Sequence, residues 1–186
     1  LLILIDMGVN MDEWKQSDLN VDSLWIIPER EKGGKHKNVY HGNFIPQIPN
    51  QLIRRYTSVG DTVLELFSGS GTTLFECESL HRDYLGFDIN EHIIEYVNDK
   101  MQDCTTINYS IRNVDVTNVV ELSTEIEAWL RIQDKQQVDF MIAHPPYLDI
   151  VKFTDDGRDL SNISNVEVFI EKLTDAITTG FRYLKK

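Results

Sequence analysis

The sequence has no apolar run that approaches the roughly 20 residues needed to cross a bilayer. Its apolar start, Leu1–Ile5, is too short for a secretion signal and has no basic flank. Only two cysteines are present, Cys77 and Cys104, with no paired spacing and no neighbouring histidine cluster. These absences argue against a disulfide framework, and they predict two free thiols, no metal site, no membrane partner and a cytoplasmic location.

Basic residues are also scarce, since 18 Lys and Arg stand against 30 Asp and Glu, a formal net charge of −12. This balance is unfavourable for a nucleic-acid-binding protein, because neutralisation of phosphates normally supplies much of the affinity. Either nucleic acid is not the substrate or the basic surface lies elsewhere. Because the sequence does not begin with Met and stops where a helix is expected to end, we expect it to be part of a longer protein.

What is present fits one globular domain, with 186 residues of which 41% are apolar. We divide the chain into an N-terminal extension with a basic loop, residues 1–38, and a main domain, residues 39–186. The basic loop, residues 30–37, is either solvated surface or a contact for a phosphate backbone.

Apolar spacing in the main domain predicts strands and helices that alternate. The predicted strands are residues 62–67, 84–88, 107–111 and 138–143, and the predicted helices are residues 49–56, 72–80, 91–101, 119–132 and 166–184. Such alternation is typical of an α/β fold in which helices cover both faces of a parallel sheet.

A glycine-rich turn follows the first predicted strand. From Phe67 to Thr73 the chain reads Phe-Ser-Gly-Ser-Gly-Thr-Thr, so a ligand can approach backbone N–H groups without meeting Cβ atoms. Leu74 replaces the third glycine of a dinucleotide fingerprint, and no Gly-Lys-Ser/Thr follows, which argues against a nicotinamide cofactor and a P-loop. The turn suits the polar tail of a nucleotide-like molecule, although such a turn is also ordinary chain geometry.

Two carboxylates follow the next two predicted strands. Asp88 ends the second strand and Asp115 follows the third, and the carboxyl ends of parallel strands lie at one edge of the sheet. Asp88 is the candidate for the hydroxyls of a ribose, and Asp115 for an adenine amino group. Either residue alone is consistent with a helix cap, but all three features in this order favour a nucleoside-containing cofactor.

The segment His144–Tyr147 follows the fourth predicted strand. Pro145 and Pro146 have no N–H to donate, so nearby carbonyls are free to accept hydrogen bonds from a substrate NH₂ group. Tyr147 offers a flat face to a planar ring, a contact worth roughly 1–3 kcal/mol per base. A base inside a duplex cannot reach such a site, so the substrate would be an unpaired or flipped-out nucleotide. An isolated Pro-Pro-Tyr is most often a rigid loop, but this position favours a site.

Together, residues 67–73 and 144–147 resemble motifs I and IV of the S-adenosylmethionine-dependent DNA amino-methyltransferases, which modify N6 of adenine or N4 of cytosine. Residues 40–49 resemble the family's motif X, and the motif order resembles the γ arrangement. The resemblance implies a Rossmann-like sheet in which the first and fourth strands are neighbours. The family's sheet has seven strands and this chain offers four, so we expect the catalytic domain, residues 39–186, to lack the last strands.

The resemblance also assigns site residues. The implied cofactor-binding residues for S-adenosylmethionine are Phe44, Pro46, Glu65, Phe67, Gly69, Gly71, Thr72, Thr73, Asp88 and Asp115, and the implied catalytic residues are His144, Pro145, Pro146 and Tyr147. Two positions depart from the family's pattern: Leu66 replaces a proline, and His144 stands where Asp, Asn or Ser accepts a hydrogen bond from the target amine. An imidazole accepts such a bond only when it is neutral.

The implied function is site-specific methylation of DNA within a restriction-modification system, in a bacterial or phage-encoded, nucleoid-associated protein. DNA would be the partner, and a second subunit or a missing C-terminal segment would carry target recognition. Two alternatives stay open: methylation of RNA or of a protein glutamine, and a non-catalytic methyltransferase-like subunit.

Overall fold

The computed structural model describes residues 18–37 and 42–186. Leu1–Ile5, and Tyr40 and His41 of the predicted motif X, lie outside the described residues. The elements in chain order are α1 (Gln47–Tyr56), β1 (Thr62–Glu65), α2 (Thr72–Leu80), β2 (Asp83–Asp88), α3 (Glu91–Met101), β3 (Tyr109–Asn113), α4 (Val119–Ile132), β4 (Phe140–Ile142), the short 3₁₀ helix η2 (Leu160–Asn162) and α5 (Val166–Phe181). None of the helices in the described ranges is long and apolar enough to span a bilayer.

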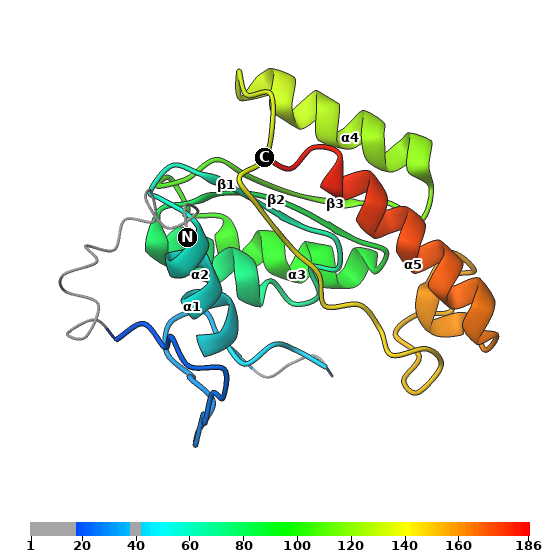
Figure 1. Cartoon of the computed structure of the whole chain (residues 1–186), viewed down its shortest axis with the longest axis horizontal. Helices are drawn as coiled ribbons and strands as arrows, with labels where there is room; N and C mark the ends of the chain where they lie inside the picture. Colours follow the sequence, from blue (N-terminus) through cyan, green and yellow to red (C-terminus); the bar gives the residue numbers. More distant parts are fainter. Residues whose placement is uncertain (1–17, 38–41) are drawn as a thin grey trace.

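The four strands form one parallel sheet in the order β3-β2-β1-β4 (Figure 1). Glu65, the last residue of β1, pairs with Gly86 of β2 on one side and with Ile142 of β4 on the other. The predicted α/β fold and the predicted pairing of the first and fourth strands are therefore confirmed. Their carboxyl ends lie together at one edge of the sheet.

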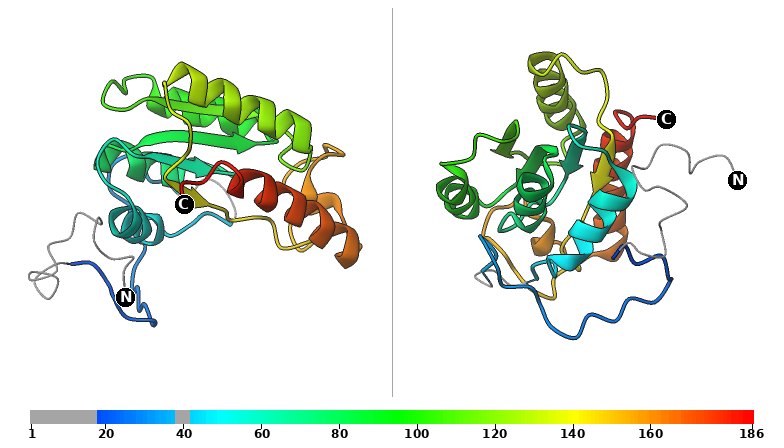
Figure 2. Two further views of the ribbon diagram at one scale, coloured as in Figure 1. Left: turned by 45° about the horizontal axis from the view of Figure 1, so that its top comes forward. Right: turned by 90° about the vertical axis from the view of Figure 1, so that its left-hand side faces the viewer.

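Helices cover both faces of the sheet (Figures 1 and 2), and the sheet separates two apolar cores. Because side chains alternate along a strand, Leu64 and Leu66 pack on the face covered by α4 and α5, whereas Val63 packs on the face covered by α1, α2 and α3. Glu65 shares the face of Val63 and is buried. An acidic side chain thus enters the core next to the glycine turn.

Asparagine side chains fix the starts of three helices. Asn90, Asn118 and Asn165 each accept a hydrogen bond from the N–H three residues ahead, at α3, α4 and α5. The helices predicted over 72–80, 91–101 and 119–132 are confirmed at both ends. At α3 and α4 the asparagine caps fix the observed starts within a few residues of sequence, whereas Gly71 at the start of α2 provides no side-chain cap.

Several predicted boundaries are wrong. Four differ by one or two residues: α1 begins at Gln47 instead of residue 49, β1 ends at Glu65 instead of residue 67, β2 begins at Asp83 instead of residue 84, and β3 begins at Tyr109 instead of residue 107. Three further boundaries have a clear physical reason. β3 continues to Asn113, because Arg112 and Asn113 still pair with β2 although they are polar. The predicted strand over 138–143 shortens to β4, because Val138 forms an isolated parallel bridge with Leu184 instead of pairing with β1. The predicted helix over 166–184 ends at Phe181 for the same reason: the chain that follows it bonds to both the N–H and the carbonyl of Val138.

The described part of the N-terminal extension lies against α1 and α2. Gln51 of α1 binds the backbone of Asn20 and of Asp18. In the basic loop, Lys35 Nζ forms an ion pair with Glu78 at 2.5 Å, and His36 Nε2 lies 2.6 Å from Oε1 of Glu76. These two side chains therefore hold the basic loop against α2.

Candidate active site

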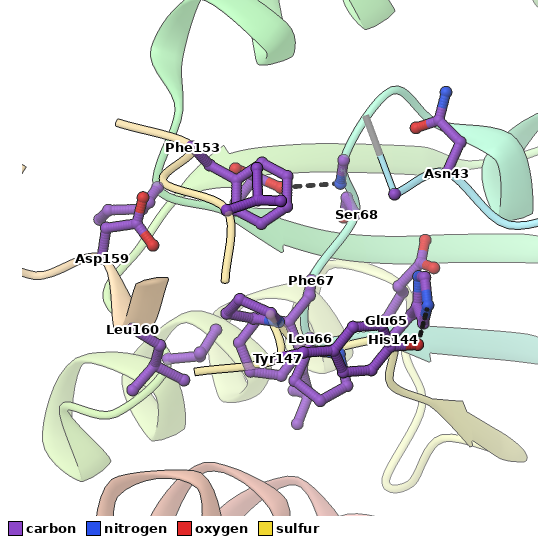
Figure 3. A pocket seen from close by; sticks show the side chains of 18 of the residues that line it. Asn43, Glu65, Leu66, Phe67, Ser68, His144, Tyr147, Phe153, Asp159 and Leu160 are labelled. Atoms are coloured by element: carbon purple, nitrogen blue, oxygen red, sulfur yellow. Dashed lines mark hydrogen bonds between the residues drawn. The ribbon is translucent and has the colours of Figure 1, made fainter. Parts of the chain in front are cut away.

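One pocket opens at the carboxyl ends of the strands. It is lined both by residues of the predicted cofactor site and by the predicted catalytic residues 144–147. It is lined by Gly42, Asn43, Phe44, Glu65, Leu66, Phe67, Ser68, Gly69, Thr72, Asp88, Ile89, Val114, Asp115, Val116, His144, Pro145, Pro146, Tyr147, Ile150, Val151, Phe153, Asp159 and Leu160. Most of these side chains are drawn in Figure 3. Ligands of open α/β sheets bind at this place, where the chain leaves neighbouring strands in opposite directions.

The glycine turn, residues 67–71, is held by backbone conformations that favour glycine. Gly69 has φ 49° and Gly71 has φ 81°. A Cβ at Gly71 would also lie 2.9 Å from Cγ1 of Val97 in α3. Gly71 is thus needed to pack α2 against α3, while Gly69 faces the pocket.

Asp88 ties the end of β2 to the glycine turn. Its Oδ2 accepts a hydrogen bond from the N–H of Gly69 (2.7 Å), and its Oδ1 accepts one from the N–H of Asn90 (2.9 Å). Burial raises the pKa of this carboxyl. Asp115, after β3, lines the same pocket and accepts hydrogen bonds from the N–H and the hydroxyl of Thr117.

Glu65 is the most buried acid of the site, with 2% of its surface exposed. Its Oε1 accepts a hydrogen bond from the hydroxyl of Thr73 (2.6 Å), and its Oε2 lies 2.6 Å from the hydroxyl of Tyr84. The Tyr84 hydroxyl also lies 2.9 Å from Oγ of Ser68, a residue of the glycine turn. Burial raises the pKa of Glu65 to about 8, an effect that these hydrogen bonds only partly offset.

Asn43 brings an unsatisfied donor to the pocket. Its Oδ1 accepts a hydrogen bond from the hydroxyl of Ser70 (2.8 Å), whereas its Nδ2 is buried and has no partner among the described residues. A buried donor without a partner costs about 1–3 kcal/mol, so it is expected to find one in a ligand.

His144 connects the two halves of the site. Its ring stacks on that of Phe44, with centroids 4.1 Å apart and planes 19° apart. Its Nε2 lies 2.8 Å from the hydroxyl of Tyr147, whose side chain is 64% exposed. Partial burial lowers the pKa of His144, which favours the neutral ring. Residue 144 is therefore held by Phe44, which lies in the predicted motif X, and by Tyr147.

Three of the predicted site residues do not line the pocket. Pro46 precedes α1, Gly71 precedes α2, and Thr73 binds Glu65 from within α2. The sequence reasoning did not identify several residues that do line it, notably Asn43, Ile89, Phe153, Asp159 and Leu160. Asn43 precedes Phe44 and Ile89 follows Asp88 in the sequence, so their position next to predicted site residues could have identified them. Asp159 ends a polar run, residues 155–159, and Phe153 and Leu160 lie on either side of that run, which gave no signal of a site.

Comparison with known proteins agrees with the geometry. The chain matches the family of N6/N4 methyltransferases described as DNA methylase over residues 6–99, which include the glycine turn and Asp88 but not His144–Tyr147. It is 39% identical over 84 residues to the Type II methyltransferase M.MjaII of Methanocaldococcus jannaschii, covering 42% of this chain and 16% of that protein. It is 29% identical over 103 residues to the Type II methyltransferase M.BglI of Bacillus subtilis, covering 55% of this chain and 27% of that protein.

Solved structures support the fold. TrmN from Thermus thermophilus superposes with a TM-score of 0.51 at 18% identity, covering 78% of this chain and 36% of TrmN. An rRNA methylase from Streptococcus thermophilus gives a TM-score of 0.50 at 12% identity, covering 75% of this chain and 63% of that one. The chain spans only 16% and 27% of the length of the two Type II relatives named above. On the family match, which covers half of its residues, the chain belongs to the DNA methylase family of N6/N4 methyltransferases.

Proposed function

We propose that this protein methylates the exocyclic amino nitrogen of adenine (N6) or cytosine (N4) in DNA, using S-adenosylmethionine. The observation that carries the proposal is the single pocket, which is lined by Gly69 and Asp88 on one side and by Pro145 and Tyr147 on the other. A methyl group moves directly between two molecules only if both fit in one enclosed space. The pairing of β1 with β4 supplies that space.

The residues of the cofactor half fit the proposed cofactor. Asp88 would accept hydrogen bonds from the ribose, Asp115 from the adenine amino group, and the Nδ2 of Asn43 would donate to the carboxylate of the cofactor's amino-acid end. S-adenosylmethionine, when bound, supplies an electrophilic methyl group. The apolar lining residues Ile89, Val114 and Val116 suit the faces of an adenine ring.

The residues of the chemical half fit a planar amine. The backbone carbonyl of Pro145 and the Nε2 of His144 would accept hydrogen bonds from the target NH₂ group. The lone pair of the amino nitrogen would then point at the methyl group. The exposed ring of Tyr147 would stack on the flipped-out base. Because Nε2 of His144 now contacts the Tyr147 hydroxyl, the base would take over that contact when it enters.

Incubation of the full chain with tritium-labelled S-adenosylmethionine tests the proposal. Unmethylated DNA, total RNA and protein are offered in parallel, and labelled nucleosides are separated. We expect label in N6-methyladenine or N4-methylcytosine from DNA. Tyr147→Ala should incorporate label roughly 10- to 100-fold more slowly, and Tyr56→Ala, at an exposed tyrosine outside the pocket, should incorporate it at the unmodified rate. Label only in RNA or protein, or cofactor binding without transfer to any substrate, would contradict the proposal.

A further inference from the structure

The loop that follows Tyr147 is held in one shape by a buried carboxylate. Asp159 is 4% exposed, and its Oδ2 accepts hydrogen bonds from the N–H and the hydroxyl of Thr154 (2.9 and 2.8 Å). Its Oδ1 accepts a hydrogen bond from the N–H of Ser161 (2.8 Å), and Oγ of Ser161 in turn accepts one from the N–H of Phe153 (3.1 Å). These bonds close residues 153–162, here called the Asp159 loop, on themselves.

The Asp159 loop forms one wall of the pocket through Phe153, Asp159 and Leu160. The ring of Phe153 reaches the opposite wall, since a Cβ at Gly42 would lie 3.5 Å from its Cζ. Burial, and to a smaller extent the charge of Asp159, raises the pKa of Asp88, so the loop lies near the predicted ribose residue.

Two aromatic side chains on one stretch of chain therefore reach different parts of one pocket. In Figure 3, Phe153 lies toward Ser68 of the glycine turn, whereas Tyr147 lies toward Phe67 and His144. Tyr147 is 64% exposed, but Phe153 is half-buried and its ring lies close to Gly42. The two rings are thus placed for two different ligands.

We propose that Phe153 covers the bound cofactor and that Asp159 is the positioning residue that holds Phe153 there. The inference rests on the proposed function, because it assumes the nucleoside cofactor in the half of the pocket at the glycine turn. An aromatic ring over a nucleoside excludes water and supplies apolar contact. The Asp159 loop is formed by its own hydrogen bonds, so little ordering is required when the cofactor binds.

Calorimetric titration with S-adenosylhomocysteine tests the role of Phe153. We expect Phe153→Ala to weaken binding by roughly 10- to 100-fold, the range given by loss of one aromatic contact. Phe153→Tyr should bind nearly as the unmodified protein does. Phe181→Ala removes an exposed phenylalanine of α5 that lies outside the pocket and should leave the affinity unchanged. Should Phe153→Ala fail to fold, Phe153→Leu is expected to weaken binding by about fivefold.

Steady-state kinetics test the positioning role of Asp159. Asp159→Asn should raise KM for the cofactor and leave KM for DNA and kcat within a few-fold, because the loop would no longer hold Phe153 in place. Asp155→Asn is the matched control, since Asp155 is an exposed acid of the same loop. A uniform loss of kcat in Asp159→Asn, or an unchanged KM for the cofactor, would refute the positioning role.

The two proposals fail in different ways. If the unmodified protein does not bind S-adenosylhomocysteine, the proposed function itself is wrong. If the unmodified protein binds but Phe153→Ala and Phe153→Leu bind equally tightly, only the role of Phe153 is wrong.

Discussion

The glycine turn after β1 and the segment His144–Tyr147 after β4 meet in one pocket, but they are built differently. The glycine turn is surrounded by buried groups, with Ser68, Ser70 and Thr72 each no more than 6% exposed. His144–Tyr147 follows the edge strand β4, and its tyrosine is 64% exposed. One side of the pocket is therefore part of the buried core, whereas on the other side His144 stacks on Phe44 and contacts Tyr147.

Because of this difference, substitutions on the two sides of the pocket should affect two different quantities, the free energy of unfolding and the methylation rate. Substitutions around the glycine turn should change the free energy of unfolding, because buried side chains have no room to adjust. Substitutions at His144 and Tyr147 should change methylation and leave the fold intact. Each of the following variants tests one side of that distinction.

The largest effect should come from Glu65 as the pH changes. Burial raises its folded-state pKa from 4.5 to about 8, so folding favours the protonated form. The stability that this preference contributes is complete below pH 4.5 and is lost as the pH rises to about 8, on the order of 5 kcal/mol in all. Glu65→Gln cannot titrate. Its free energy of unfolding, relative to that of the unmodified protein, should therefore increase by several kcal/mol between pH 5 and pH 8.5.

Urea unfolding of both proteins at the two pH values measures this gain. Asp88, whose pKa is also raised by burial, is present in both proteins, and its charge contributes to the raised pKa of Glu65, so the difference reports Glu65 together with this coupling. Glu91→Gln, at an exposed acid of α3, is the matched control and should show no gain. A constant difference between Glu65→Gln and the unmodified protein would mean that Glu65 is not held in its protonated form by the core.

Gly86→Ala should cost about 3 kcal/mol in the free energy of unfolding, the upper part of the usual range for overpacking. A Cβ at Gly86 would lie 2.3 Å from both Oγ of Ser68 and the hydroxyl of Tyr84, two groups of the network around Glu65. Gly157→Ala, which has nothing within 4 Å, should be nearly neutral. Urea unfolding at one pH compares the two alanines, and equal stabilities would argue that the buried network is loosely packed.

Tyr147→Ala should lower the methylation rate by roughly 10- to 100-fold through loss of base stacking. Its stability should stay within about 0.5 kcal/mol, as for other exposed positions. Tyr147→Phe keeps the ring and should retain most of the activity. Single-turnover methylation and urea unfolding of the three proteins separate the two effects. A Tyr147→Ala protein that is destabilised but still active would show that Tyr147 supports the fold and not the reaction.

The same distinction explains which features could be predicted from the sequence. Apolar spacing and the glycine turn are local patterns, and the ends that they predict for α2, α3 and α4 are correct. The pairing of β1 with β4 followed from the family resemblance and is confirmed. β3 and β4 were predicted as strands, but their predicted ends are wrong, because those ends depend on pairing with β2 and on the bridge to Leu184.

The parts of the site that were not predicted depend on contacts between distant segments. Phe44 and His144 are 100 positions apart, yet their rings stack. No sequence pattern marks Tyr84 as part of the site, because its hydroxyl meets Glu65 only once β2 pairs with β1. Phe153 and Asp159 lie in a stretch that reads as a polar loop, and only the fold shows that Asp159 is buried.

The smallest effect should be a shift in the pH dependence of methylation that comes from His144. Partial burial lowers its pKa below the usual 6.5, so the neutral, hydrogen-bond-accepting ring persists below that pH. We expect the ratio of the methylation rates of the unmodified protein and His144→Asn to be constant from pH 8 to pH 6.5. The ratio should fall only at lower pH, by a few-fold, because asparagine accepts a hydrogen bond at every pH. Single-turnover rates with saturating DNA measure this ratio and cancel the titration of Glu65 and Asp88, which both proteins share. A ratio that stays flat down to pH 5 would show that His144 does not accept the hydrogen bond of the target amine, and its stacking on Phe44 would then be its whole role.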